Sequence, residues 1–278
     1  MQQGLLIFER MKVQNMKNIF IEGLQGAGKS TLLNNIHRHM PQYKVYYEGD
    51  ISPVELAWCS YMTEEQYNNV CLVYPGLCNE LKKRAVNEDG MKIIDYTHIL
   101  TDEEGFHKYM EQYEIYNGNI PYKDFRDIIL KRYRNFNGNG NIFECSFFQN
   151  IIECLMLFYK MPEDTIIKFY KDIFKVLEDK SFLMFYIDVT DIRGTILDIR
   201  KDRTDQNGNE LWFPLMMQYL ENSPYVQAGG YGTGNIMAGR GMDMLVCHLE
   251  KRRRLEHKII NEITGSSTII IPSKKYIL

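Results

Sequence analysis

The sequence predicts an α/β protein in which a five-stranded parallel sheet lies between two layers of helices. Three observations lead to this fold class. Short apolar runs are centred near residues 19, 45, 143, 185 and 270, helical patterns separate them, and a glycine-rich turn follows the first run. Strands that alternate with helices form parallel sheets whose two faces are both covered.

The first part of the chain reads as strand, turn, helix and strand. Residues 17–22 form an apolar run that is typical of a buried strand. A helix is predicted over 29–39, and Pro41 follows it as a break. The second strand covers 43–47 and ends in the acidic turn Glu-Gly-Asp at 48–50.

The stretch 53–136 is predicted to be a helical insertion. Pro53 is suited to the first position of a helix, with Ser52 as its cap. Helices are also expected over 102–113 and 121–136, with a short strand at 92–96. The block is too long for a simple crossover between two strands, so we expect it to bind a substrate.

The remaining elements alternate in the same way. Strands are expected at 141–144, 182–188 and 268–271, and helices at 147–159, 163–178, 191–203, 211–220 and 242–263. Thr190 is the expected cap of the third of these helices. Residues 1–16 are predicted to be a tail, and the glycine-rich stretch 228–241 a loop.

Composition narrows the classes of function. The 278 residues are 45% hydrophobic and 25% charged, with a net charge of −3, so no affinity for nucleic acid polymers is expected. We find no membrane-spanning run and no signal-peptide layout. Six cysteines without a C-x-x-C pair indicate a reduced, cytoplasmic protein. A homodimer stays open as an oligomeric state.

The glycine-rich turn matches the pattern G-x-x-x-x-G-K-[ST]. It reads Gly23-Leu24-Gln25-Gly26-Ala27-Gly28-Lys29-Ser30, with Thr31 next in the helix. Glycines let the backbone approach a phosphate chain closely, and the helix N-terminus adds positive potential. In such a loop the lysine reaches the β- and γ-phosphates and the serine holds Mg²⁺. The residues predicted to bind ATP are Gly23, Gln25, Gly26, Ala27, Gly28, Lys29, Ser30 and Thr31.

In the order of its motifs, the chain resembles the P-loop kinases of the nucleoside and nucleotide kinase group, which includes deoxynucleoside and thymidylate kinases. Four features carry the resemblance: the loop, the acidic turn at 48–50, Phe143-Glu144-Cys145-Ser146, and an arginine-bearing helix after the strand 182–188. The resemblance implies a P-loop NTPase fold as one kinase-like domain over 17–278. The insertion 53–136 has no counterpart among these motifs.

The resemblance also implies roles for acidic residues. Glu48 or Asp50 would take the proton of the acceptor hydroxyl, and Glu48 is favoured because it leaves the strand directly. Glu144 would hold Mg²⁺ together with Ser30. Nucleoside kinases usually carry arginine after this acid, and the present chain has Cys145, which removes one expected phosphate contact.

A lid is predicted over about 193–210. Arg200 and Arg203 resemble the lid arginines that close over the phosphates in this group, and with Lys29 they are the cations expected to act in catalysis. The alternative is an ordinary charged helix end. The basic run at 251–254 is interpreted as a solvated helix face.

Acceptor contacts are predicted from position. The candidates are Trp58, Tyr96, Glu114, Tyr116 and Gln149, since an aromatic ring can stack on a base and polar groups can bond its edge.

The sequence therefore predicts a phosphotransferase that uses ATP and Mg²⁺ and acts on a nucleoside or a nucleoside monophosphate. Two alternatives stay open: a nucleotide-binding regulatory switch, and a kinase for a non-nucleoside metabolite or an antibiotic. A Ras-like switch usually carries the guanine-reading motif N-K-x-D, which the sequence lacks.

Overall fold

The structure is a computed structural model that describes residues 17–231 and 240–273. The predicted tail 1–16 and residues 232–239 of the predicted glycine-rich loop lie outside the described residues. The chain divides into two compact units. The first contains residues 1–45 and 137–278, the second contains 46–136, and each is described by itself. The predicted insertion 53–136 falls within the second unit.

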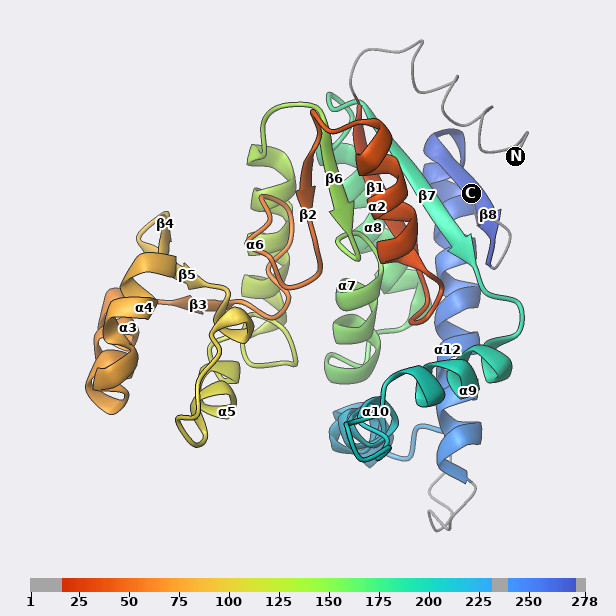
Figure 1. Cartoon of the computed structure of the whole chain (residues 1–278). Coiled ribbons are helices and arrows are strands. Elements are labelled where there is room, and N and C mark those ends of the chain that lie inside the picture. The colour runs from red at the N-terminus through yellow and green to blue at the C-terminus, as the bar shows by residue number, and fades with distance from the viewer. Residues whose placement is uncertain (1–16, 232–239, 274–278) are drawn as a thin grey trace. The chain divides into compact units, whose positions relative to one another are not determined.

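A five-stranded parallel sheet forms the centre of the first unit, as the sequence predicts (Figure 1). Its strands stand in the order β2-β6-β1-β7-β8. They are β1 (Asn18–Gly23), β2 (Lys44–Tyr46), β6 (Asn141–Glu144), β7 (Phe182–Asp188) and β8 (Thr268–Pro272). In the register of the central strands, Phe20 lies opposite Phe143 on one side and Met184 on the other.

The central strand is buried on both faces. All six residues of β1 are inaccessible to solvent, which requires a covering layer on each side of the sheet. Phe20 stacks on Phe143 and meets Phe147 and Phe182 edge to face, so aromatic rings build one half of the core. Figure 1 shows helices in front of and behind these strands, an arrangement compatible with three layers.

The helices of the first unit follow the predicted order. They are α2 (Lys29–His39), α7 (Gln149–Glu153), α8 (Glu163–Val176), α9 (Ile192–Asp202), α10 (Trp212–Asn222), α11 (Pro224–Gln227) and α12 (Arg240–Ile259). The π-helical turns Cys154–Phe158 and Ile260–Thr264 prolong α7 and α12. The cap of α9 is Asp191, whose carboxylate accepts the N–H of Gly194, and not Thr190 as predicted.

The strand order creates a switch point between β1 and β6. The chain leaves β1 towards β2 at one edge of the sheet, and it leaves β6 towards β7 on the opposite side of β1. Connections that diverge in this way open a crevice at the carboxyl ends of two neighbouring strands, where α/β proteins bind ligands. The glycine-rich loop follows β1, and Glu144 ends β6.

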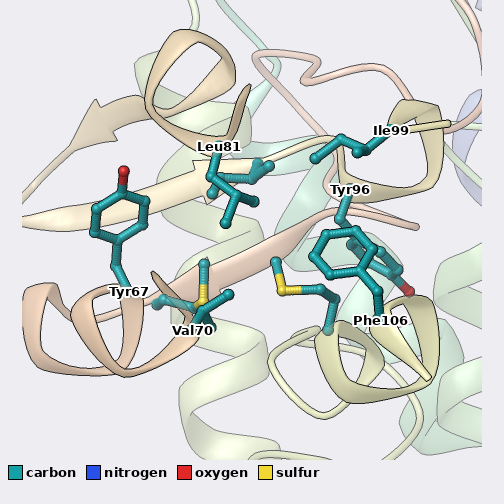
Figure 2. Close-up of a cluster of buried hydrophobic side chains, with 9 residues drawn as sticks. Tyr67, Val70, Leu81, Tyr96, Ile99 and Phe106 are labelled. Carbon is teal, nitrogen blue, oxygen red and sulfur yellow. The ribbon is translucent and has the colours of Figure 1, made fainter. Parts of the chain in front are cut away.

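The second unit combines helices with a small antiparallel sheet in the order β3-β5-β4. Its elements are β3 (Ser60–Met62), α3 (Glu64–Val73), α4 (Cys78–Arg84), β4 (Val86–Glu88), β5 (Met91–Ile94), α5 (Phe106–Glu111) and α6 (Tyr122–Asn135), with 3₁₀ turns at Pro75–Leu77 and Tyr96–His98. Figure 2 shows its core, in which Val70, Leu81, Ile99 and Phe106 pack with Tyr67 and Tyr96.

Two predictions for this stretch need correction. The unit is less helical than predicted: the strand expected at 92–96 is present as β5, and β3 and β4, which no pattern predicts, pair with it in a sheet. No helix begins at Pro53 either. The hydroxyl of Ser52 accepts the N–H groups of Val54 and Glu55, as a helix cap does, but the chain continues as a local turn. A serine hydroxyl can accept the N–H groups two and three residues later in a turn as well as at the start of a helix.

Within the described ranges, none of the helices has the length and apolar character needed to cross a membrane.

Candidate functional site

The glycine-rich loop is folded tightly against the elements around it. Gly23, Gly26 and Gly28 all have positive φ angles, of 141°, 73° and 96°. A Cβ atom on Gly23 would come within 2.5 Å of the Ile187 carbonyl oxygen, and one on Gly26 would come equally close to the Ile199 side chain. Glycine is therefore required at both positions, for conformation and for space.

The loop leads directly into the first turn of α2. No side chain among the described residues caps this turn, and Gly28 in the left-handed conformation precedes it. The first N–H groups of a helix have no partner within the helix, so those of Lys29, Ser30 and Thr31 are suited to an anion. The first turn also carries no acidic residue that would repel one.

Lys29 is buried and bonded to the loop itself. Its ammonium group donates to the carbonyl oxygens of Gly23 at 3.0 Å and Leu24 at 2.9 Å, and to Oε1 of Gln149 at 3.0 Å. The three acceptors are neutral, and within residues 17–231 and 240–273 no carboxylate accepts a hydrogen bond from this cation. The charge of Lys29 is thus held beside the loop by groups that leave it available to neutralise an anion.

Ser30 and Glu144 meet at the switch point. The Ser30 hydroxyl donates to Oε1 of Glu144 at 2.5 Å. Oxygen atoms of this kind are the ligands that Mg²⁺ prefers. The described residues contain no group of three or more His, Cys, Asp or Glu side chains that could hold a metal. Ser30 and Glu144 are the two side chains here that could each supply an oxygen ligand to a cation.

Glu22, the residue before the loop, lies fully buried in β1. Its carboxylate accepts the N–H groups of Phe147 at 2.6 Å and Phe148 at 3.1 Å. Burial raises the pKa of Glu22 to about 7, although these hydrogen bonds and the charge of Lys29 oppose the rise. Glu22 thus ties the end of β1 to the segment that follows β6.

A buried ionic network behind the loop corrects the interpretation of the basic run 251–254. Arg254 is exposed, as a solvated face requires, but Arg252 is fully buried in α12. Its guanidinium group pairs with Glu153 at 2.6 Å and Glu256 at 2.8 Å. Helical spacing alone predicts which residues share a face, whereas the burial of Arg252 also depends on Glu153, which lies 99 residues away in the sequence.

The predicted lid residues differ in their surroundings. Arg200 is held by Glu210, with Nη2 at 2.7 Å from the carboxylate, and its guanidinium carbon lies 4.4 Å from the centre of the Phe213 ring. Arg203 follows α9 with an exposed side chain. Across the described ranges no hydrogen bond or ion pair engages that side chain. The structure therefore holds the Arg200 side chain against Glu210 and leaves that of Arg203 exposed.

The predicted general bases lie in the second unit. Asp50 closes a tight turn, because its carboxylate accepts the N–H of Tyr47 at 2.7 Å. Glu48 accepts the indole N–H of Trp58 at 3.3 Å. Trp58 is 45% exposed and has a φ of 62°, which is uncommon for a bulky residue. Glu48 and the exposed ring of Trp58, two predicted contacts of an acceptor, are therefore neighbours within the unit.

Three other predicted acceptor contacts are buried in the same unit. The Tyr96 hydroxyl donates to Glu114 at 2.5 Å, and Tyr116 packs edge to face on Phe125. Each of the three is at most 3% exposed. Their role as acceptor contacts stays a prediction, and packing already accounts for their position. Gln149, the fifth candidate, lies in the first unit and is bonded to Lys29.

Glu55, an acid that its position in the sequence also makes a candidate for the acceptor pocket, is buried in the second unit. Its Oε1 accepts the N–H of Ala57 at 2.5 Å. Burial raises the pKa of Glu55 to about 8. The hydrogen bond from Ala57 and the charge of Arg132 oppose the rise, and the charge of Glu48 adds to it. At neutral pH the folded second unit therefore favours a protonated Glu55.

We expect this acid to make the second unit less stable as pH rises. Below pH about 4.5 the carboxyl is protonated in both states, and above about 8 it is ionised in both. Between these limits the folded state binds more protons, so the unfolding free energy falls with pH, by about 4 kcal/mol. Urea titrations of a Trp212→Phe background, in which Trp58 reports on the second unit, measure this decline.

The matched variants are Glu55→Gln and Glu104→Gln, the latter at an exposed acid of the same unit. Glu55→Gln should flatten the decline markedly. Part of the decline should remain, because burial also raises the pKa of Glu114, to about 7. Glu104→Gln should leave the decline unchanged. Equal slopes in all three proteins would contradict the assignment to Glu55.

Together these observations define an α/β protein with a parallel sheet and a glycine-rich loop at the switch point of that sheet. Comparison with protein-family models gives no match to this sequence, and comparison with curated proteins gives none either.

Proposed function

We propose that this chain is a phosphotransferase of the P-loop kinase type, which moves the γ-phosphoryl group of ATP to a small-molecule acceptor in the presence of Mg²⁺. The observation that carries the proposal is that Lys29 is held at the loop that follows β1, while its neighbour Ser30 bonds Glu144 at the carboxyl end of β6. A cation, a hydroxyl and a carboxylate around an uncapped helix start are the groups that a metal–triphosphate requires.

Each group has a separate task in this proposal. The N–H groups of the loop and of the first turn of α2 hold the phosphate oxygens. Lys29 exchanges the carbonyl oxygens of Gly23 and Leu24 for phosphate oxygens and stabilises the charge that develops during transfer. Ser30 and Glu144 would hold Mg²⁺, which supplies positive charge to the phosphates when bound. Arg203, and Arg200 once it leaves Glu210, would add charge from the lid.

The acceptor is proposed to be a nucleoside or a nucleoside monophosphate, and Glu48 the base that takes the proton of its hydroxyl. The support is chemical: a carboxylate and an exposed indole ring lie together at Glu48 and Trp58. A ring of this kind can stack on a nucleobase, and a carboxylate can polarise a hydroxyl.

The proposal is tested by measuring ADP release from ATP·Mg²⁺ with a panel of nucleosides, nucleoside monophosphates, sugars and aminoglycosides. Release that requires one of the first two classes supports the proposal as stated. Release that requires a sugar or an aminoglycoside would keep the kinase and replace its acceptor. Turnover that no acceptor accelerates would favour a regulatory NTPase and contradict the proposal.

Glu144→Gln should separate metal binding from nucleotide binding. The substitution keeps the shape of the side chain and removes its charge. The rate of transfer should therefore fall about 100-fold, and the Mg²⁺ concentration that gives half-maximal activity should rise. Titration of activity with Mg²⁺ at fixed ATP measures both effects. The control is Glu178→Gln, at an exposed acid after α8. An unchanged Mg²⁺ requirement in Glu144→Gln would contradict the metal assignment.

A further inference from the structure

Arg252 has an environment that surface residues of a basic helix do not have. Its side chain is inaccessible to solvent, and its pKa lies above the ordinary arginine range because the carboxylates of Glu256 and Glu153 outweigh the effect of burial. A buried guanidinium group is tolerated only when it is fully paired. The partners of Arg252 thus show what this cation does in the fold.

Two of the partners are acids that belong to the core. Glu256 lies one turn further along α12, and its second oxygen accepts the hydroxyl of Tyr186 in β7 at 2.7 Å. Glu153 ends α7, and its second oxygen bonds His248 at 2.7 Å. Burial alone would raise the pKa of Glu153, but His248 and Arg252 lower it to about 2. The guanidinium group is therefore fixed from two sides.

The other two partners belong to the glycine-rich loop. Nη2 of Arg252 donates to the Gly23 carbonyl oxygen at 3.3 Å, and Nη1 donates to Oε1 of Gln25 at 3.0 Å. The Gly23 carbonyl also accepts from Lys29. Because a peptide unit is planar, a donor that holds the Gly23 carbonyl also sets the direction of the Leu24 N–H on its other side.

We propose that Arg252 is a positioning residue that holds the loop in the conformation that receives phosphate. The inference rests on the proposed function, in which Lys29 turns from the Gly23 carbonyl to phosphate oxygens. The Gly23 carbonyl oxygen then loses Lys29 as a hydrogen-bond donor, but it keeps the hydrogen bond from Arg252. The loop keeps its shape because its second support comes from α12 and not from the residue that moves.

The inference predicts that the loop loosens when Arg252 is altered, even without nucleotide. Arg252→Lys keeps the charge but cannot reach four acceptors in the same fork. Hydrogen exchange of a peptide covering residues 22–30 should accelerate about tenfold or more relative to a peptide from β7, since two charge-assisted bonds to the loop are lost. The dissociation constant of ATP·Mg²⁺ should rise by a similar factor.

Two further variants make the test decisive. Arg254→Met removes a positive charge from the exposed side of the same helix and should change both readouts less than twofold. Gln25→Leu breaks only one bond of Arg252 and should accelerate loop exchange about threefold. Gln25→Leu decides the question if Arg252→Lys does not fold. Loop exchange equal to that of the unaltered protein in every variant that folds would overturn the inference.

The design also separates this inference from the proposed function. Exchange is measured without any nucleotide, so it reports on the loop alone. An unaltered protein that binds no ATP·Mg²⁺ would refute the proposed function, whatever the exchange rates are. An unaltered protein that binds ATP·Mg²⁺, with variants whose loops exchange at the same rate, would refute only the role of Arg252.

Discussion

Lys29→Ala should abolish phosphoryl transfer. The ammonium group is the cation of the loop, and its loss removes charge that is proposed to stabilise the transferring group, so turnover should fall by at least about 10²- to 10³-fold. ATP affinity should fall as well, because the same group is proposed to bind phosphate oxygens before transfer. Steady-state turnover and calorimetry with ATP·Mg²⁺ measure the two effects.

Two comparison variants test whether the loss of activity comes from the missing charge or from a destabilised loop. Lys29 also satisfies the carbonyl oxygens of Gly23 and Leu24, so its removal destabilises the loop. Lys29→Met retains most of the aliphatic stem and should be as inactive as Lys29→Ala. Lys168→Ala, at an exposed lysine on α8, should retain full activity. If Lys29→Met turned over ATP nearly as fast as the unaltered protein, the assignment of Lys29 to the phosphate-binding loop would be contradicted.

Glu48→Gln should slow transfer by about 10²- to 10⁴-fold while ATP affinity is retained, because a general base acts on the acceptor and not on the nucleotide. The assay uses the acceptor that the panel identifies. Asp50→Asn is the matched variant. Since the Asp50 carboxylate accepts the Tyr47 N–H, this change should weaken the turn and reduce transfer less. A large loss in Asp50→Asn with normal transfer in Glu48→Gln would show that Asp50 is the base.

Local patterns explain the parts of the fold that the sequence predicts well. The strand β7 is an uninterrupted apolar run, and its observed limits, Phe182–Asp188, are the predicted ones. The loop is also a local feature, because glycine at 23, 26 and 28 permits the positive φ angles that the turn needs. Such elements depend mainly on residues that are neighbours in the chain.

Features that depend on distant partners were missed or misjudged. The predicted cap of α9, Thr190, lies one residue before the observed cap, Asp191, because both residue types can cap a helix and they are neighbours in the chain. The burial of Arg252 could not be predicted, because Glu153 lies 99 residues away and belongs to another helix. One signal was present in the sequence: Glu256 stands four residues after Arg252, at the spacing of a helical ion pair.

The link between Gly23 and Arg252 joins residues that are 229 positions apart. A ribosome releases the glycine loop well before the arginine that supports it, because Arg252 follows Gly23 by 229 residues. Strands β1, β2, β6 and β7 therefore leave the ribosome before this support exists, and only β8 follows it. We expect firm nucleotide binding to be acquired only after α12 has been synthesised and has docked.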